Sequence, residues 1–313
     1  MTLPSLDAPL KIGTRGSPLA LAQAYETRQR LMTAFDLPEG AFEIVVIKTT
    51  GDRILDRPLK EIGGKGLFTR EIEDDLLSGA IDIAVHSMKD MPVAQPDGLA
   101  LTTYLPREDV RDAFVSLDGG KLADLREGAV VGTSSLRRKA QLLNYRPDLE
   151  IVESRGNVQT RLKKLKDGVA EATFLAMAGL NRLAMDEVPR TAIEAEEMLP
   201  AVAQGCSVIE QRLGDDRVSE MLSAINDTLS TQRLAAERAF LGALDGSCET
   251  PIGGLATIDG DTLTLRGEIL RVDGSEVLSD EQTCSVADGA KLGVEMARKL
   301  RSQADDDFFS WLN

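Results

Sequence analysis

A lysine and a carboxylate, Lys89 and Asp90, follow a short apolar run at residues 81–85. Gly79 and Pro92 bound this stretch, and the pattern is typical of a buried strand in a parallel sheet. Open α/β sheets bind ligands beyond the carboxyl ends of their strands, so this strand would bring an amine and a carboxylate to such a place. On these residues alone, a polar loop with solvated side chains is the preferred interpretation.

A second candidate for chemistry is Cys248, which lies in a loop between Gly246 and Gly254. A thiolate in such a loop can attack an electrophile, although a small buried residue is the usual alternative for a lone cysteine. For Cys206 and Cys284, a small buried residue is the preferred interpretation. The three cysteines are far apart and odd in number, which argues against a disulfide framework.

His86 is the single histidine of the chain, so no histidine-based metal site of the usual kind is expected. No nucleophile elbow accompanies it, which argues against a serine hydrolase. General acid–base work therefore falls to Asp, Glu or Lys. Because His86 directly follows an apolar run, we expect it to be a structural hydrogen-bonding residue.

The charge is unevenly distributed along the chain. The net charge is −15, which argues against general nucleic-acid binding, yet residues 131–170 contain nine Lys/Arg against four Asp/Glu. A basic island in an acidic protein suggests a specific site for an anionic ligand. The alternative is a solvated basic helix face, which explains Lys163, Lys164 and Lys166 equally well.

Two segments repeat one pattern: a short strand ending in Gly-Thr, a serine suited to cap a helix, and then the helix. The strands are residues 10–14 and 129–133, and the capping serines are Ser17 and Ser135. Helix-end N–H groups point at the preceding loop, so each unit is a potential anion cradle. Two lobes with facing cradles imply a ligand in a cleft between them, whereas a single Gly-Thr pair is explained by turn chemistry.

The remaining elements follow from hydrophobic spacing and turn residues. Further strands are expected at residues 42–47, 99–104, 150–153, 172–175 and 207–212, with helices at 19–32, 68–77 and 176–183 and another opening within 154–161. Residues 49–66 read as a long mobile cover. Residues 106–112 and 199–205 read as two crossings between lobes, which would form a hinge. A helix at 231–244, antiparallel strands at 255–258, 262–270 and 276–284, and a helix at 287–300 complete the chain.

The predicted fold is α/β, with two lobes like those of periplasmic binding proteins joined by a hinge and a small C-terminal α+β domain with an antiparallel sheet. The predicted domains are 1–105 with 206–226 for the first lobe, 106–205 for the second lobe, and 227–313 for the C-terminal domain. A length of 313 residues fits two or three domains. No apolar run approaches a membrane span, and the N-terminus does not read as a signal peptide, so a cytoplasmic protein without membrane contact is expected.

Seven motifs in order make the chain resemble the porphobilinogen deaminase family, also called hydroxymethylbilane synthases, over about residues 10–300. They are Thr14-Arg-x-Ser17, Gly63-Gly-Lys-Gly-Leu-Phe68, His86-Ser-Met-Lys-Asp90, Gly132-Thr-Ser-Ser-x-Arg-Arg138, Arg155-Gly-Asn157 with Arg161, Gln204-Gly205 and Gly246-x-Cys248. Each motif alone is weak evidence, whereas all seven in this order are very specific.

The resemblance implies a transferase of tetrapyrrole, porphyrin and heme biosynthesis. Such an enzyme condenses four porphobilinogen molecules head to tail, with loss of ammonia, onto a covalent dipyrromethane cofactor, and then releases the linear tetrapyrrole by hydrolysis. By position, Cys248 would hold the cofactor as a thioether and Asp90 would be the catalytic carboxylate. A buried carboxylate there can stabilise the cationic azafulvene that forms when ammonia leaves.

Carried over residue by residue, the resemblance also assigns ligand-binding residues. Each pyrrole bears an acetate and a propionate, which arginine binds in a bidentate way that lysine cannot. The cofactor-binding set is Lys89, Thr133, Ser134, Ser135, Arg137, Arg138, Arg161 and Gln204. The substrate-binding set is Arg15, Ser17, Gln23, Lys65, Phe68, Arg155 and Arg182, where Phe68 either stacks on a pyrrole or belongs to the core.

The chain departs from many relatives at Cys206, where a small apolar residue is common, and Glu249 adds a negative charge beside Cys248. Neither removes a group that the mechanism needs. We expect a monomer without metal or nucleic-acid partners. The competing hypothesis is a non-catalytic two-lobed anion-binding protein, which explains the cradles but leaves Cys248 without a role.

Overall fold

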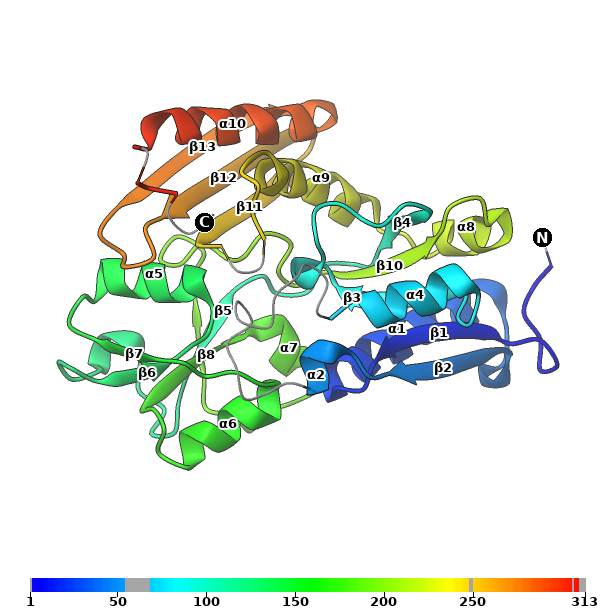
Figure 1. The fold of residues 1–313 in the computed structure, drawn as a ribbon, viewed down its shortest axis with the longest axis horizontal. Helices are drawn as coiled ribbons and strands as arrows, with labels where there is room; N and C mark the ends of the chain where they lie inside the picture. The colour runs from blue at the N-terminus through cyan, green and yellow to red at the C-terminus, as the bar shows by residue number, and fades with distance from the viewer. Residues whose placement is uncertain (1, 54–67, 248–249, 306, 310–313) are drawn as a thin grey trace. The chain divides into compact units, whose positions relative to one another are not determined.

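The computed structural model describes residues 2–53, 68–247, 250–305 and 307–309. Its strands form two five-stranded sheets and one three-stranded sheet (Figure 1). The chain divides into two compact units, Met1–Arg107 with Cys206–Thr231 and Glu108–Gly205 with Gln232–Asn313. The sequence-based division into three domains stays a prediction.

The first unit contains a mixed sheet in the order β2-β1-β3-β10-β4. Strand β1 runs parallel to β2 and β3, whereas β10 runs antiparallel to both β3 and β4. The strands are β1 (Leu10–Arg15), β2 (Phe42–Ile47), β3 (Ile83–Ser87), β4 (Leu99–Tyr104) and β10 (Ser207–Arg212). All five were expected from the sequence, including the return of 207–212 to the first lobe's sheet.

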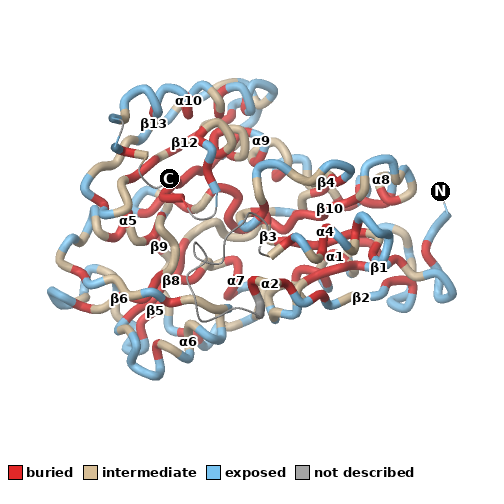
Figure 2. Tube along the Cα trace, viewed as in Figure 1, coloured by how far each residue is buried: buried red, intermediate tan, exposed pale blue. Residues whose placement is uncertain are grey.

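Helices cover both faces of this sheet because its strands are apolar on both sides. Ile83 and Val85 pack with α1 (Pro18–Phe35) and α8 (Asp216–Ser223), whereas Ala84, which points the other way, packs with α4 (Arg70–Ser78). Figure 2 shows the resulting buried strands between more exposed helices. The short α2 (Thr50–Arg53) lies inside the segment predicted as a loop, and the rest of that segment, 54–66, lies outside the described residues.

The second unit repeats the same arrangement in the order β7-β6-β8-β5-β9. Strand β6 is parallel to β7 and β8, and β5 is antiparallel to β8 and β9. The elements are β5 (Asp112–Ser116), β6 (Val130–Gly132), α5 (Leu136–Tyr145), β7 (Glu150–Val152), α6 (Val158–Lys166), β8 (Ala172–Ala176), α7 (Met177–Arg182) and β9 (Thr191–Ile193). Strands β5 and β9 were not predicted from the sequence. Phe114 of β5 and Phe174 of β8 meet edge to face, 5.7 Å between centroids, at the centre of this core.

The same unit contains the predicted small α+β domain. Strands β11 (Ile252–Asp259), β12 (Thr262–Leu270) and β13 (Val277–Ser285) form an antiparallel sheet with α9 (Thr228–Ala243) and α10 (Gly289–Gln303). Helix α9 starts three residues earlier than predicted, because the Asp227 carboxylate accepts a hydrogen bond of 2.7 Å from the Ser230 N–H. The predicted α/β fold with an antiparallel C-terminal sheet is thus confirmed.

The turn between β12 and β13 packs directly on the last turn of α5. Asn144 Nδ2 donates to the Gly274 carbonyl oxygen at 2.9 Å, and a Cβ on Gly274 would lie 2.6 Å from the Asn144 nitrogen. Gly274 also has φ +75°, so two constraints require glycine there. The C-terminal segment closes over the same turn, since Arg271 binds Asp305 at 2.7 Å and contacts the ring of fully buried Phe308.

Candidate functional site

In the first unit, β1 leads into the helix cap that the sequence predicts. Ser17 Oγ accepts a hydrogen bond from the Ala20 N–H at 3.3 Å, and Pro18 occupies the first turn of α1. Arg15, at the end of β1, lies with its guanidinium carbon 4.2 Å from the centroid of the Phe68 ring. The fold therefore brings two of the predicted substrate-binding residues, Arg15 and Phe68, into a cation–π contact.

Gln23 ties the ends of two neighbouring strands together. Its Nε2 donates to Ser207 Oγ at 2.9 Å, and its Oε1 accepts from Ser87 Oγ at 3.1 Å. The Gln23 side chain is 2% exposed, so both hydrogen bonds lie in the protein interior. These contacts fix the carboxyl end of β3, from which the chain continues to Asp90.

Asp90 ends a 3₁₀ turn, Met88–Asp90, that follows β3 directly. Buried Met88 anchors the turn, because its N–H donates to the Cys206 carbonyl oxygen at 2.9 Å. The Asp90 side chain is exposed and Lys89 is half-buried. The expectation of a buried carboxylate at Asp90 is wrong for the described chain, since burial ends with Met88 and the turn directs Asp90 to the surface of its unit.

His86 has a structural partner, as the sequence suggests. A hydrogen bond of 3.1 Å joins His86 Nε2 to the fully buried Glu210 on β10. A further buried carboxyl, Glu73 on α4, shares this environment. Burial raises the pKa of Glu73, and the charge of Glu210 adds to this effect.

The raised pKa of Glu73 makes the stability of the protein depend on pH. Because the folded state holds this proton more tightly than the unfolded state, the contribution of Glu73 to stability is lost as pH rises through its folded pKa. We expect Glu73→Gln to raise the melting temperature by a few degrees at pH 8 and by less at pH 4.5. The control is Asp97→Asn, an exposed carboxylate of the same unit that is not among the charges acting on Glu73. A melting-temperature difference for Glu73→Gln that is constant with pH would contradict this.

In the second unit, the other predicted cradle forms at the start of α5. Ser135 caps the helix, accepting from the Arg138 N–H at 3.4 Å, and its own N–H donates to Thr133 Oγ1 at 3.2 Å. Ser134 Oγ donates to the Ser154 carbonyl oxygen at 2.9 Å. Loop and helix end are thus held in one geometry, with the helix N-terminus contributing partial positive charge.

Arg137 and Arg138 lie in the interior and share one carboxylate. They are 3% and 4% exposed, and both pair with Asp112, which is fully buried at the start of β5. Gln204 also reaches this carboxylate, with Nε2 donating to Asp112 Oδ1 at 3.0 Å and to the Val110 carbonyl oxygen at 2.8 Å. Burial alone raises the pKa of Asp112, but the two arginine charges and the hydrogen bonds from Arg138 and Gln204 outweigh it and hold the pKa well below its usual range.

Three other predicted arginines are half-buried in the same unit. Arg161 Nε donates to the Gly156 carbonyl oxygen at 2.9 Å, and an Arg182 N–H donates to the Gly205 carbonyl oxygen at 3.1 Å. Arg155 directly precedes Gly156. Gly205 has φ +89°, and a Cβ there would lie 2.5 Å from the Glu108 carbonyl oxygen. The two chain crossings therefore pass too closely for any side chain at this point.

Several predictions fall outside the described residues, namely those on Cys248, Glu249, Lys65 and the greater part of loop 49–66. Cys206 is buried, with its thiol near the Leu105 carbonyl oxygen at 3.5 Å. Burial raises the pKa of the half-buried Cys284 thiol, and the charge of Asp288 adds to the shift. Cys284 therefore lacks the depressed pKa of a reactive thiol.

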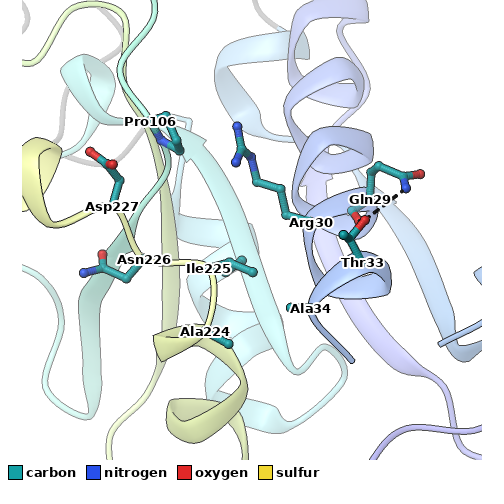
Figure 3. Close-up of a pocket in the computed structure, with 9 residues that line it drawn as sticks. All are labelled: Gln29, Arg30, Thr33, Ala34, Pro106, Ala224, Ile225, Asn226 and Asp227. Atoms are coloured by element: carbon teal, nitrogen blue, oxygen red, sulfur yellow. Dashed lines mark hydrogen bonds between the residues drawn. The ribbon is translucent and has the colours of Figure 1, made fainter. Parts of the chain in front are cut away.

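A surface pocket of about 480 Å³ lies in the first unit, beside the C-terminal half of α1 and the segment that links α8 to α9 (Figure 3). Arg30, Thr33 and Asn226 contribute to its lining, and none of the predicted site residues does. Within the described ranges, no group of three or more His, Cys, Asp or Glu side chains could hold a metal ion, and no helix is long and apolar enough to cross a membrane.

Asp112 is the site residue that the sequence analysis missed. It stands last in a polar stretch, 106–112, that reads as a linker. The one available signal is the apolar run Ala113-Phe114-Val115 that follows it, which makes Asp112 the first residue of a strand. That run predicts a strand but does not reveal that the carboxylate would meet two arginines.

Comparison with known proteins agrees with the motifs. The family model for "Porphobilinogen deaminase, dipyromethane cofactor binding domain" matches residues 10–220, and that for "Porphobilinogen deaminase, C-terminal domain" matches residues 231–302. Porphobilinogen deaminase of Paracoccus denitrificans is 65% identical over 309 residues, covering 99% of each chain. The same enzyme from Nitrobacter winogradskyi is 52% identical over 299 residues, covering 96% of this chain and 95% of the relative.

Solved structures with similar folds include the periplasmic VFT2 domain of Bordetella pertussis BvgS and the aliphatic sulphonate binding protein SsuA from Escherichia coli. The first is 16% identical with a TM-score of 0.43 and covers 74% of this chain and 92% of its own. The second is 14% identical with a TM-score of 0.41 and covers 75% of this chain and 70% of its own. The two family models and the two relatives carry the assignment: the chain belongs to the porphobilinogen deaminase family.

Proposed function

We propose that Asp90 in the first unit and the arginine-rich site of the second unit carry out the activity that family membership gives this chain. That activity is hydroxymethylbilane synthase, a transferase of tetrapyrrole and heme biosynthesis. It condenses four porphobilinogen molecules onto a dipyrromethane cofactor and releases the linear tetrapyrrole by hydrolysis. The observation that carries the function is the 65% identity to a porphobilinogen deaminase over 99% of both chains. This identity disfavours the alternative of a non-catalytic two-lobed anion-binding protein.

The residues of the second unit fit an anionic dipyrromethane. Arg137 and Arg138 share the single charge of Asp112, so one positive charge is left over, and buried Arg137 Nε has no hydrogen-bond partner among the described residues. A ligand carboxylate would satisfy both the charge and the donor. When bound, the cofactor supplies the terminal pyrrole carbon to which substrate is added, and Cys248 would attach it as a thioether.

The remaining cofactor contacts follow from position in the same unit. Thr133, Ser134 and Ser135 offer hydroxyl and N–H groups at the start of α5, and Arg161 and Gln204 are held by nearby backbone oxygens. Lys89, in the first unit, remains a proposed cofactor contact on family resemblance alone. Gln204 has a second role, because it also donates to Asp112.

Porphobilinogen carries one amine and two carboxylates, so its binding needs cations and a group for the leaving amine. We assign the carboxylates to Arg15, Arg155 and Arg182, supported by Ser17, Gln23 and Lys65, and pyrrole stacking to Phe68. The contact between Arg15 and Phe68 supports this assignment, because it holds a cation beside an aromatic face. Asp90 is exposed at the end of a fixed turn, where a carboxylate can contact a pyrrole N–H.

The function is tested by incubating the purified protein with porphobilinogen and measuring hydroxymethylbilane as uroporphyrin after acid cyclisation. Intact mass supplies a second readout, since the loaded protein should exceed its sequence mass by one dipyrromethane. A protein that consumes no porphobilinogen and has its bare sequence mass would refute the function. We also propose a cytoplasmic monomer without metal or nucleic-acid partners, which size-exclusion chromatography with light scattering tests for the oligomeric state.

A further inference from the structure

Asp112 is an acidic residue at the centre of a basic site. It is 0% exposed, and side chains from two separate segments converge on it: Arg137 and Arg138 from α5, and Gln204 from the 199–205 crossing. The described chain thus places a carboxylate where an anionic ligand is expected. Family resemblance and sequence patterns assign it no role.

Each carboxylate oxygen of Asp112 has its own partners. Oδ1 accepts from Arg138 Nε at 3.0 Å, from an Arg138 terminal nitrogen at 2.7 Å and from Gln204 Nε2 at 3.0 Å. Oδ2 lies 2.8 Å from a terminal nitrogen of Arg137. Arg138 also donates a hydrogen bond to the Phe174 carbonyl oxygen. Arg137 donates to the Gln141 side-chain oxygen and to the Leu199 carbonyl oxygen. The orientation of both guanidiniums is therefore set by protein groups.

The charge in this cluster is not balanced. Burying a charge is costly unless an opposite charge accompanies it, and Asp112 supplies one negative charge for two positive ones. Glu268 on β12 is the other carboxyl nearby: Gln141 joins it to Arg137 through hydrogen bonds, and its charge also acts on Arg137. Burial raises the pKa of Glu268 despite the Gln141 hydrogen bond, so it compensates Arg137 less completely than Asp112 does.

We propose that Asp112 is a positioning residue that serves as a resident anion of the cofactor site. It holds Arg137 and Arg138 in a fixed orientation before cofactor is present, and it leaves one positive charge for a cofactor carboxylate. The identity of that ligand rests on the proposed function. In the cofactor-free protein Asp112 is the main counter-charge of the pair, whereas in the loaded protein a ligand carboxylate shares this role.

The variant that tests this is Asp112→Asn, which keeps the shape and one acceptor oxygen but removes the charge. Cofactor-free protein is produced in a host that cannot make porphobilinogen, and loaded protein is obtained by adding porphobilinogen, with intact mass as the measure of loading. We expect the melting temperature of cofactor-free Asp112→Asn to fall by about 5–10 °C relative to the parent. Loading should restore at least half of this loss.

The matched control is Asp148→Asn. Asp148 forms a partly exposed ion pair with Arg146 in the same unit, and the substitution removes its negative charge. It should shift the melting temperature equally in both states. Equal losses in both states for Asp112→Asn would overturn the proposal, as would a folded Asp112→Asn that gains no mass. A parent that gains no mass would overturn the proposed function and this inference together, whereas a normally loading parent confines the failure to Asp112.

If Asp112→Asn does not fold, the double variant Asp112→Asn/Arg137→Gln tests whether Asp112 acts through its charge. It removes one charge of each sign, so the cluster keeps the net charge of the parent. We expect it to fold, to melt above Asp112→Asn and to gain cofactor mass to a smaller extent than the parent. A double variant that is no more stable than Asp112→Asn would show that Asp112 acts through its hydrogen bonds and not through its charge.

Discussion

Replacement of Asp90 by Asn should lower the turnover of porphobilinogen by about a thousandfold or more. As ammonia leaves, positive charge develops on the pyrrole ring and its N–H becomes a stronger donor. A carboxylate therefore binds the transition state more tightly than the ground state, which is the requirement for catalysis. Asn keeps the size and loses the charge. Because Asp90 is exposed at the end of its turn, we expect the melting temperature and cofactor mass to be unchanged.

The measurement is hydroxymethylbilane formation per loaded enzyme, with loading taken from intact mass. Asp97→Asn is a suitable control, since Asp97 is an exposed carboxylate of the same unit. Asp90→Glu, which keeps the charge but displaces it, should retain a small fraction of the activity. If fully loaded Asp90→Asn turned over within a few-fold of the parent, Asp90 would be structural and another carboxylate would have to serve.

Replacement of Cys248 by Ser should abolish cofactor attachment and, with it, all synthase activity. A serine hydroxyl is a far weaker nucleophile than a thiolate near neutral pH, so it cannot form the covalent link. The protein should have its bare sequence mass and should not react with Ehrlich's reagent, which colours pyrroles. Since loading also stabilises a folded protein, we expect a lower melting temperature than for the loaded parent.

Cys284→Ser provides the comparison for this variant, because Cys284 is a half-buried thiol on β13 without the depressed pKa of a nucleophile. It should keep the full added mass and the activity. Added mass and pyrrole colour in Cys248→Ser would show that another residue holds the cofactor.

Features that depend on neighbouring residues were predictable from the sequence. The caps at Ser17 and Ser135 are examples, since each hydrogen bond spans three residues and depends on local turn chemistry. Strands with a clear apolar run were also predicted: β2 and β10 to the residue, and β3 to within two residues of each end. Family resemblance then supplied the roles of Asp90 and Cys248, which residue patterns alone did not.

Features that depend on distant residues were not predictable. The hydrogen bond between Arg138 and Asp112 joins residues 26 apart in sequence, and that between Gln204 and Asp112 joins residues 92 apart. Strand β9 forms by pairing with β5, where Ile193 lies opposite Asp112, a residue far away in the sequence. The exposure of Asp90 was also misjudged, because an apolar run predicts a buried strand but not where the following turn directs its side chains.

The position of β10 in the first sheet has a consequence for synthesis of the chain on the ribosome. Strand β10 lies between β3 and β4, yet it follows β4 by about 100 residues, during which the whole second five-stranded sheet is made. At a translation rate of about 5–20 residues per second, β10 is therefore synthesised roughly 5–20 seconds after β4. Throughout that interval β3 presents an unpaired edge of apolar residues, which is a template for aggregation. The nascent protein thus needs cover for this edge, from a chaperone or from its own earlier helices, until residue 212 emerges.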